Sequence, residues 1–316
     1  MLNIYQMGLR PLNEDEAHKY AHKACLWFNI KHATADNGAT VKRLLGIELP
    51  SLGETRDLEE SERLYIEDNS VFMTATVLSI SDKSVQESCL SEIIFILGGK
   101  FIITVSNDDV IDLAACKTHS YLNAEDNSCA LFIGMMEAMV GRTSDILSLV
   151  SSTIDTLSPL IFGSGDNKRD FGTMLQEIGR NGELLSRIRE SLVSLSRVVS
   201  FARRYAAGEK KYNKSLEIVN KDIKSLVDYS SFMAGKFNLL LDATLGLINI
   251  KQSNIIKIFT VASVIFLPPT LIASIYGMNF QHMPELALRW GYGAALALML
   301  ISAILPYCIF KYKKWL

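Results

Sequence analysis

The sequence predicts an α/β domain followed by a long α-helical stalk and two C-terminal transmembrane helices. Three observations support this fold class. Strand-like alternation is confined to the first third of the chain, and from about residue 130 apolar residues recur at spacings of three and four. Two long uncharged apolar runs lie near the C-terminus. A soluble part is therefore expected to precede a membrane part.

The composition excludes several other classes of protein. Hydrophobic residues make up 49% of the 316 residues and the formal net charge is −2, which excludes a disordered chain. With 32 basic and 34 acidic residues there is no overall field to attract nucleic acid, so no such partner is expected. The five cysteines include no Cys-x-x-Cys pair, and we expect buried thiols rather than disulfides or a zinc site.

Motifs of catalysis and nucleotide binding are missing from the sequence. There is no Walker-type phosphate loop, so transport driven by ATP is not expected. A Gly-x-Ser-x-Gly motif does not occur either. We therefore expect neither an enzyme nor an organic cofactor.

Residues 1–125 are expected to form the α/β domain. Residues 72–78 alternate as a strand should, and residues 92–97 and 101–105 flank a Gly-Gly turn as in a hairpin. Before these strands, residues 40–45 are expected to be helical, with Thr40 as the N-cap and Gly46 closing the helix.

Residues 126–256 are expected to form a helical bundle and the stalk helix. A Gly- and Ser-containing break at residues 163–167 predicts at least two long helices before Gly208. The following apolar residues keep a 3-4-3 rhythm that Ser230 and Thr244 interrupt. The members of this apolar seam are Leu216, Val219, Ile223, Leu226, Met233, Phe237, Leu240 and Leu247. If the helix continues to Tyr276, about 60 residues at about 1.5 Å each give a rod of roughly 90 Å.

Two segments are long enough to cross a hydrocarbon core, residues 257–277 and residues 291–310. A short loop, residues 278–290, joins them, and a basic tail, residues 311–316, ends the chain. Lysines flank the pair of segments on its outer ends, so the positive-inside rule predicts both termini in the cytoplasm. A buried soluble hairpin is the alternative, and two full-length spans with basic flanks disfavour it.

One face of the first span carries all of its hydroxyl side chains. This hydroxyl stripe, at spacings of three and four, consists of Ile256, Thr260, Ser263, Leu267, Thr270, Ser274 and Gly277. Hydroxyls gathered on one face usually meet another helix or water rather than lipid, and packing against the second span would explain them by itself. Two spans cannot enclose a pathway, so any pore requires several copies in a ring. Pro268 and Pro269 are expected to free backbone carbonyls toward whatever the stripe faces.

A resemblance rests on the residues at the end of the first span. The sequence Tyr276-Gly277-Met278-Asn279-Phe280 is followed by Met283-Pro284-Glu285-Leu286 in the loop and by the basic terminus. In this arrangement the chain resembles the CorA family of divalent-cation channels. Residues 45–50, 61–68 and 72–74 are similar to the cytoplasmic domain of that family.

The resemblance implies a funnel-shaped homopentamer in the bacterial inner membrane, in which the stalk helices lead into a pore-lining first span. It implies Mg²⁺ as the transported ion, with Co²⁺ and Ni²⁺ as further substrates. Five copies of Gly277, Met278 and Asn279 would form the selectivity filter. Mg²⁺ loses its water reluctantly, and a ring of carboxamides and carbonyls can hydrogen-bond the hydrated ion without stripping it.

The resemblance also implies roles for residues below and beside the filter. Thr270 would form a polar ring, and Ile256, Phe259 and Leu267 would form a hydrophobic constriction that gates by dewetting. Glu285 would gather cations at the mouth. The family closes when cytoplasmic Mg²⁺ bridges acidic residues of neighbouring subunits, and the candidates here are Asp222, Asp228 and Asp242, with Glu67 or Asp68 on the α/β domain. A solvated surface carboxylate is the alternative for each.

The expected partners are other copies of the chain, membrane lipid and divalent cations. Two alternative functions stay open. The first is the zinc-transporting branch of the same superfamily, which ion competition would separate from a magnesium channel. The second is a membrane-anchored sensor or adaptor, which predicts no ion flux and leaves the hydroxyl stripe unexplained.

Overall fold

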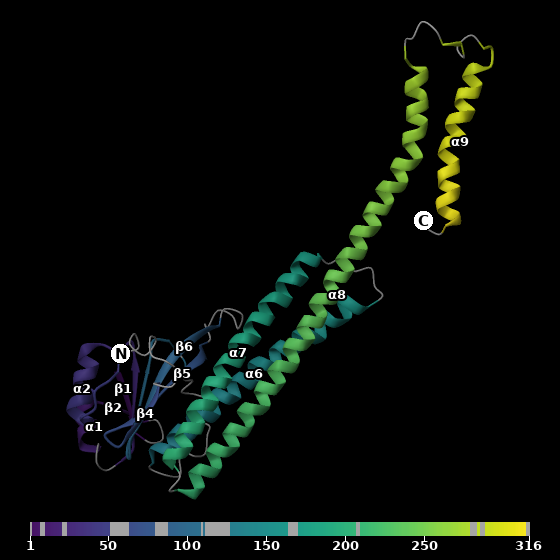
Figure 1. Cartoon of the computed structure of the whole chain (residues 1–316). Coiled ribbons are helices and arrows are strands. Elements are labelled where there is room, and N and C mark those ends of the chain that lie inside the picture. The colour runs from purple at the N-terminus through teal and green to yellow at the C-terminus, as the bar shows by residue number, and fades with distance from the viewer. Residues whose placement is uncertain are drawn as a thin grey trace. The chain divides into compact units, whose positions relative to one another are not determined.

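The computed structural model describes most of the chain in two compact units, Met1–Asp242 and Ala243–Leu316. The described residues are 2–6, 10–20, 24–50, 63–79, 88–108, 110, 127–163, 170–206, 209–278, 283–284 and 288–313. Figure 1 shows the elements, with the N-terminal sheet in purple and blue and the C-terminal helix in yellow.

The first unit contains a mixed sheet whose strand order is β2-β1-β3-β7-β6-β5-β4. The strands are β1 (Leu2–Gln6), β2 (Arg10–Leu12), β3 (Leu26–Lys31), β4 (Leu64–Glu67), β5 (Ser70–Ser79), β6 (Cys89–Leu97) and β7 (Phe101–Ser106). Neighbouring strands are antiparallel except β3 and β7, which run parallel. The strand expected at residues 72–78 and the hairpin expected at residues 92–105 are confirmed as β5, β6 and β7.

Strand β3, an inner strand between β1 and β7, was not predicted from the sequence. Its residues Leu26 to Ile30 are all buried, so it shows a continuous apolar run instead of the alternation that marks a half-buried strand. The one polar residue in this run, Asn29, accepts a hydrogen bond from the Thr104 hydroxyl at 3.2 Å. Trp27 donates its indole N–H to the same hydroxyl at 2.9 Å. The buried polar groups of β3 and β7 therefore satisfy one another.

Helices cover both faces of this sheet (Figure 1). On one face lie α1 (Glu14–Tyr20) and α2 (Ala35–Leu45). Their buried residues Ala17 and Val41 join one apolar cluster with side chains of the sheet. On the other face lie α6 (Ser128–Phe162) and α7 (Phe171–Tyr205), and the ring of Phe132 meets Phe95 of β6 edge to face at 5.6 Å. Strand β6 is therefore buried on both faces.

Helix α2 begins earlier than the sequence analysis predicted. The expectation that Thr40 caps a helix over residues 40–45 was wrong, because the helix starts at Ala35 and its N-cap is Thr34. The Thr34 hydroxyl accepts a hydrogen bond from the Asn37 N–H at 3.4 Å, and Asp36 adds a negative charge to the first turn. The predicted C-terminus is confirmed, since Gly46 ends the helix in the left-handed conformation with φ 75°.

Substitution by alanine at two glycines of this helix region is expected to change the stability of the first unit in opposite directions. Gly46→Ala should destabilise the first unit by about 1 kcal/mol, because a Cβ disfavours positive φ. Gly38→Ala should stabilise it by up to about 1 kcal/mol, because Gly38 lies inside the helix. Neither new Cβ would meet another atom within 4 Å, so the comparison isolates backbone conformation. Urea unfolding followed by circular dichroism measures both changes, and equal signs would contradict the explanation.

Strand β4 is shorter than its neighbour β5. Beyond the end of β4, side chains of α7 form hydrogen bonds with β5. The Thr74 N–H still donates to the Arg63 carbonyl at 2.9 Å. The next two N–H groups on this edge, those of Thr76 and Leu78, donate instead to the hydroxyls of Ser194 and Ser191, at 2.8 and 3.1 Å. Side chains of α7 therefore hold this part of β5.

The long helices follow the predicted pattern. The break expected at residues 163–167 separates α6 from α7, and α8 runs from Lys210 to Tyr276 as one helix of 67 residues. At about 1.5 Å per residue it is roughly 100 Å long. Leu226 and Leu247 are half-buried and the other members of the apolar seam are buried. Ser230 and Thr244 are also buried, so they continue the seam rather than interrupt it.

Three of the described helices, α6, α8 and α9 (Gly291–Tyr312), are long and apolar enough to cross a membrane. In the most apolar stretch of α6, 33% of the residues are buried, compared with 0% in α8 and 6% in α9. The apolar residues of α6 form part of the core of the first unit. The two helices with exposed apolar stretches are those that the sequence predicted as spans.

Candidate functional site

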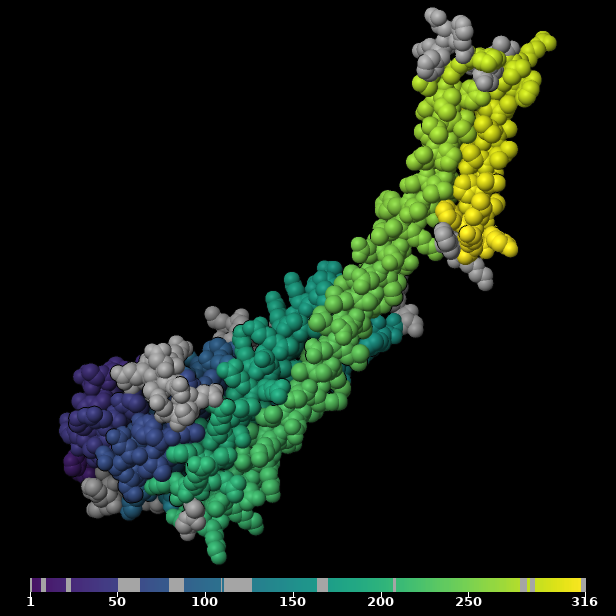
Figure 2. Space-filling view, in the orientation of Figure 1, coloured from purple at the N-terminus to yellow at the C-terminus, as the bar shows by residue number. Residues whose placement is uncertain are grey.

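In the second unit, α9 covers one face of the last part of α8. Half-buried residues recur on α8 at spacings of three and four, namely Val261, Ile265, Pro268, Ile272 and Tyr276. The corresponding residues of α9 are Ala295, which is buried, and Met299, Ser302, Pro306 and Phe310, which are half-buried. Figure 2 shows the two helices side by side in light green and yellow. These two sets of residues form the contact within the hairpin.

The hydroxyl stripe lies on the other face of α8. All seven of its members, from Ile256 to Gly277, are exposed. At 100° per residue this stripe lies roughly opposite the half-buried face. Packing against the second span, which the sequence alone left open, is therefore not the reason for the stripe. Within the described residues, its hydroxyls are left for water or for another copy of the chain.

Hydroxyl groups of the stripe bond to the helix backbone. Thr260 donates to the Ile256 carbonyl at 2.8 Å and Thr270 donates to the Phe266 carbonyl at 2.7 Å. These bonds satisfy the hydroxyl protons, so the oxygen lone pairs remain exposed on the stripe. A face of this kind offers hydrogen-bond acceptors to the water around a cation.

The two prolines do not contribute to the stripe as expected. Pro268 and Pro269 are half-buried, on the side of α8 that faces α9. The carbonyls that lose their helical donors belong to the residues four positions earlier, Val264 and Ile265, which are also half-buried. The expectation that the prolines free carbonyls toward the stripe was therefore wrong, and the helix continues through both of them.

The three residues assigned to a hydrophobic constriction lie on or beside the stripe. Ile256, Phe259 and Leu267 are 57%, 70% and 64% exposed. Side chains as large as these are usually buried, so their exposure in a single chain marks a surface that contacts lipid or another copy. Leu267 precedes Thr270 by about one helical turn on the same face of α8. In a ring of several copies, these positions would form an apolar ring next to a polar ring.

The end of the first span is described only as far as Met278. The Gly277 N–H donates to the Ala273 carbonyl at 2.9 Å, and a Cβ at Gly277 would lie 3.1 Å from that oxygen. Glycine therefore lets the last turn close without moving its neighbour, and Met278 follows with an exposed side chain. Asn279 and Glu285, the expected filter side chain and the expected cation attractor, lie outside the described residues.

The acidic candidates differ in their surroundings. Asp222, Asp228 and Asp242 are all exposed on α8. Asp222 borders a pocket of about 420 Å³ together with Glu137 of α6. Glu137 was not predicted from the sequence, because it lies far from Asp222 along the chain. Two carboxylates at one pocket are suitable ligands for Mg²⁺, which keeps several waters and needs only one or two carboxylates.

The acidic pair on the α/β domain also borders a pocket. Glu67 and Asp68 surround it with Glu48, whose carboxylate pairs with Lys42. The bond to Lys42 lowers the pKa of Glu48, so this carboxylate is ionised at neutral pH. Across all described residues, no group of three or more His, Cys, Asp or Glu side chains is arranged to hold a metal ion.

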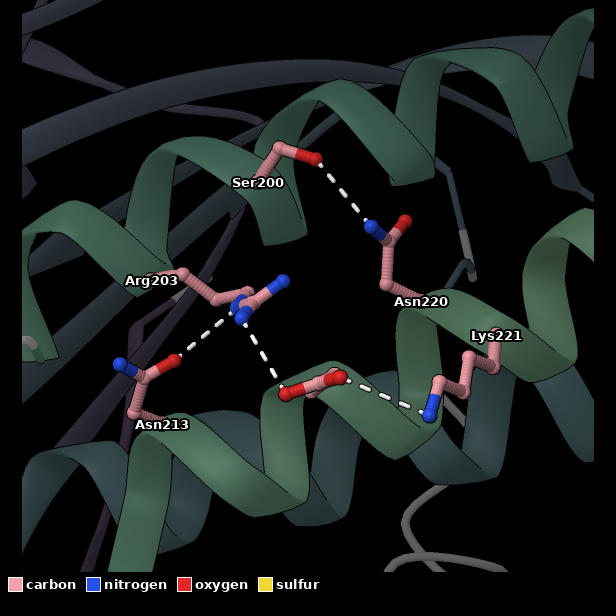
Figure 3. Close-up of polar contacts among 6 residues, drawn as sticks. Ser200, Arg203, Asn213, Asn220 and Lys221 are labelled. Atoms are coloured by element: carbon pink, nitrogen blue, oxygen red, sulfur yellow. Dashed lines mark hydrogen bonds and ion pairs between the residues drawn. The ribbon is translucent and has the colours of Figure 1, made fainter. Parts of the chain in front are cut away.

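A polar network fixes the first part of α8 to α7 beside Asp222. Arg203 of α7 donates to Asn213 at 3.0 Å and to Glu217 at 3.4 Å, and Lys221 pairs with Glu217 at 3.5 Å. Asn220, which is buried, donates to Ser200 at 3.4 Å (Figure 3). The bonds of Arg203 and Asn220 join α7 to α8, so they define the register of α8 against α7.

The four described cysteines do not form a ligand set, and Cys116 lies outside the described residues. Cys25 is buried as expected, but Cys89 and Cys308 are exposed, so the expectation of buried thiols was wrong for these two. Cys308 lies on α9, where a side chain turned away from α8 is exposed in a single chain. Burial raises the pKa of Cys129 to about 11, and the charge of Glu209 adds to this effect. Its thiol is therefore protonated at neutral pH and is a poor metal ligand.

Comparisons with known proteins agree with this architecture. The sequence matches the family described as CorA-like Mg²⁺ transporter protein over residues 22–313. It is 31% identical over 303 residues to the magnesium transport protein CorA of Wolinella succinogenes, covering 92% of this chain and 91% of that protein. It is 28% identical to the magnesium transport protein CorA of Pasteurella multocida, over 100% of both chains.

A solved structure supports the fold over the same length. The CorA magnesium transporter from Methanocaldococcus jannaschii has a TM-score of 0.76 at 19% identity, covering 100% of this chain and 99% of that one. This likeness extends through the sheet, the long helices and the C-terminal hairpin. With a family match over most of its length, the chain belongs to the CorA-like Mg²⁺ transporter family.

Proposed function

We propose that the chain transports Mg²⁺ across the bacterial inner membrane, with both termini in the cytoplasm, through a pore formed by five copies. The observation that carries this proposal is the exposed hydroxyl stripe of α8, which faces away from α9. A hairpin that only anchors a sensor has no need of a polar face on the side away from its partner helix. A face that borders water does need one.

The arrangement of copies follows from the geometry of the hairpin. Two helices leave no channel between them, so the hydroxyl stripes of several copies must enclose it. With the stripe inward, α9 lies behind α8 and its apolar residues face lipid. The family to which the chain belongs supports five copies around the pore. In this arrangement Thr270 forms the polar ring, and Ile256, Phe259 and Leu267 form the constriction.

The membrane potential is the driving force in this proposal. An inside-negative potential favours entry of a divalent cation by roughly 4.6 kcal/mol per 100 mV. The hydrated ion enters through Gly277, Met278 and Asn279, where amide and carbonyl oxygens hold its water shell. Glu285 raises the local concentration of cations at the mouth. Co²⁺ and Ni²⁺, whose hydrated ions have similar size and octahedral geometry, are further substrates.

Uptake into proteoliposomes tests this function. Mg²⁺ should enter liposomes that carry the wild-type chain when a K⁺ diffusion potential makes the interior negative, and should enter slowly without the potential. Asn279→Ala should reduce uptake by at least about tenfold, equivalent to a loss of ~1.4 kcal/mol. Asn238→Ala, which changes an exposed asparagine of the first unit, is the matched control.

The outcomes separate the candidate functions. If correctly assembled protein passes no Mg²⁺ but passes Zn²⁺, the zinc-transporting branch is the better assignment. If neither ion passes, the anchored sensor or adaptor accounts for the chain. Equal uptake by wild type and Asn279→Ala would remove Asn279 from the filter while leaving the transport function in place.

Cytoplasmic Mg²⁺ is proposed to close the channel by binding acidic residues of the soluble part. Among the candidates, Asp222 is the best supported, because Glu137 borders the same pocket. Asp222→Lys is expected to keep uptake high at internal Mg²⁺ concentrations that inhibit the wild type. Asp155→Lys, another exposed aspartate in the first unit, is the control. Inhibition that is unchanged in Asp222→Lys and Asp228→Lys would exclude both positions.

A further inference from the structure

A pocket outside the proposed ion pathway lies between α7 and the edge of the sheet. Its volume is about 320 Å³. Arg63, Thr74 and Thr76 border it from the sheet. The side chains of α7 that border it recur at spacings of three and four, so they share one face of the helix; the charged and polar ones are Ser186, Arg189, Glu190, Ser194 and Arg197.

The charges at this pocket are predominantly positive. Three arginines and one glutamate border it, and because Glu92 pairs with one of these arginines the local formal charge is +1, on a chain whose net charge is −2. Arg189 and Arg197 are exposed on α7. Arg63 lies deeper and pairs with Glu92 at 3.5 Å, so its position is fixed by that carboxylate. Three guanidinium groups around one pocket are suited to an anion that carries more than one charge.

The uncharged lining supplies hydroxyl donors. The Ser194 hydroxyl accepts the Thr76 N–H at 2.8 Å, which leaves its own proton available to a ligand. Ser186 and Thr76 line the same pocket. Among the described residues that line it there is no aromatic side chain on which a nucleobase would stack. The donors favour an oxyanion without a large apolar part.

We propose that this pocket binds a small phosphate anion with at least two negative charges, such as inorganic pyrophosphate. Arginine forks hydrogen-bond phosphate oxygens in pairs, and the serine and threonine hydroxyls complete the set of donors. Glu190 at the rim opposes binding by its charge, and so limits the affinity. The site is formed by one copy of the chain and uses none of the residues assigned to the pore.

Calorimetric titration of the full-length protein in detergent with pyrophosphate tests the proposal, with EDTA present to remove Mg²⁺ from the anion. The double variant Arg189→Gln/Arg197→Gln should weaken binding by at least about tenfold, because two charge-assisted contacts are lost. Arg180→Gln changes another exposed arginine of α7 that does not border the pocket, and should bind like the wild type. Glu190→Gln should bind several-fold more tightly.

No heat of binding for the wild type up to about 10 mM pyrophosphate would exclude the site. Equal weakening by Arg180→Gln and by the double variant would show that overall charge, and not this pocket, attracts the anion. All substituted residues are exposed, so unchanged thermal unfolding midpoints are expected and verify that the variants are folded.

Discussion

Mg²⁺ uptake by Thr270→Lys is expected to fall at least about 100-fold below that of the wild type. Thr270 is exposed on the face of α8 that turns away from α9. In the proposed pentamer it contributes one side chain to a ring around the ion. A single lysine charge about 6 Å from Mg²⁺ at an effective dielectric constant of about 20 raises the energy of the ion by ~5 kcal/mol. Each ~1.4 kcal/mol of barrier corresponds to about a tenfold lower rate.

Thr270→Gln is the matched control for this variant. Glutamine is similar in length to lysine but carries no charge, so it tests whether size alone blocks the pore. We expect the glutamine variant to retain most of the uptake, measured with a Mg²⁺-sensitive dye inside the liposomes. Equal uptake by the two variants, with both assembled like the wild type on size exclusion, would place Thr270 outside the pathway.

Phe132→Ala is expected to lower the stability of the first unit by about 3–5 kcal/mol. The Phe132 ring is buried between α6 and the sheet, where it meets Phe95 edge to face at 5.6 Å and 84°. The substitution leaves a cavity in a close-packed core and removes the aromatic contact. Because this core joins the long helices to the sheet, its loss affects the whole first unit.

Phe162→Ala on the same helix provides the comparison. Phe162 is 57% exposed near the end of α6, so its removal should cost less than about 1 kcal/mol. Urea unfolding followed by circular dichroism measures both variants against the wild type. A similar loss in the two would indicate that the interface between α6 and the sheet contributes little to the stability of the unit.

The parts of the fold that the sequence predicted are those with local signals. The alternation at residues 72–78, the Gly-Gly turn of the hairpin and the spacing of the apolar seam all depend on neighbouring residues. Strand β3 was missed because its residues are buried on both faces and no alternation remains. Thr34 was missed as a cap because Thr40 stands nearer to the apolar end of the same helix, and propensity does not choose between two good caps.

In the candidate site, too, the sequence predicted what local spacing determines and missed what tertiary packing determines. Helical spacing alone placed the hydroxyls of the first span on one stripe. It did not determine which face of α8 packs against α9, because periodicity defines faces without assigning their neighbours. The half-buried positions Val261 and Ile265 supply that assignment, and they also account for the error about the prolines. The proximity of Glu137 to Asp222 depends on tertiary packing, which no spacing in the sequence reports.

The serines of α7 that bond to β5 limit how copies of the chain can associate. An open strand edge is a template on which a strand of another chain can add, and such addition leads to shared sheets or to aggregates. On β5 the N–H groups of Thr76 and Leu78 are already occupied by side chains of α7, so this stretch offers no donor to an incoming strand. Assembly through this part of the sheet is thereby prevented. A closed ring, which stops growth at a fixed number of copies, would therefore have to form without strand addition at this stretch of β5.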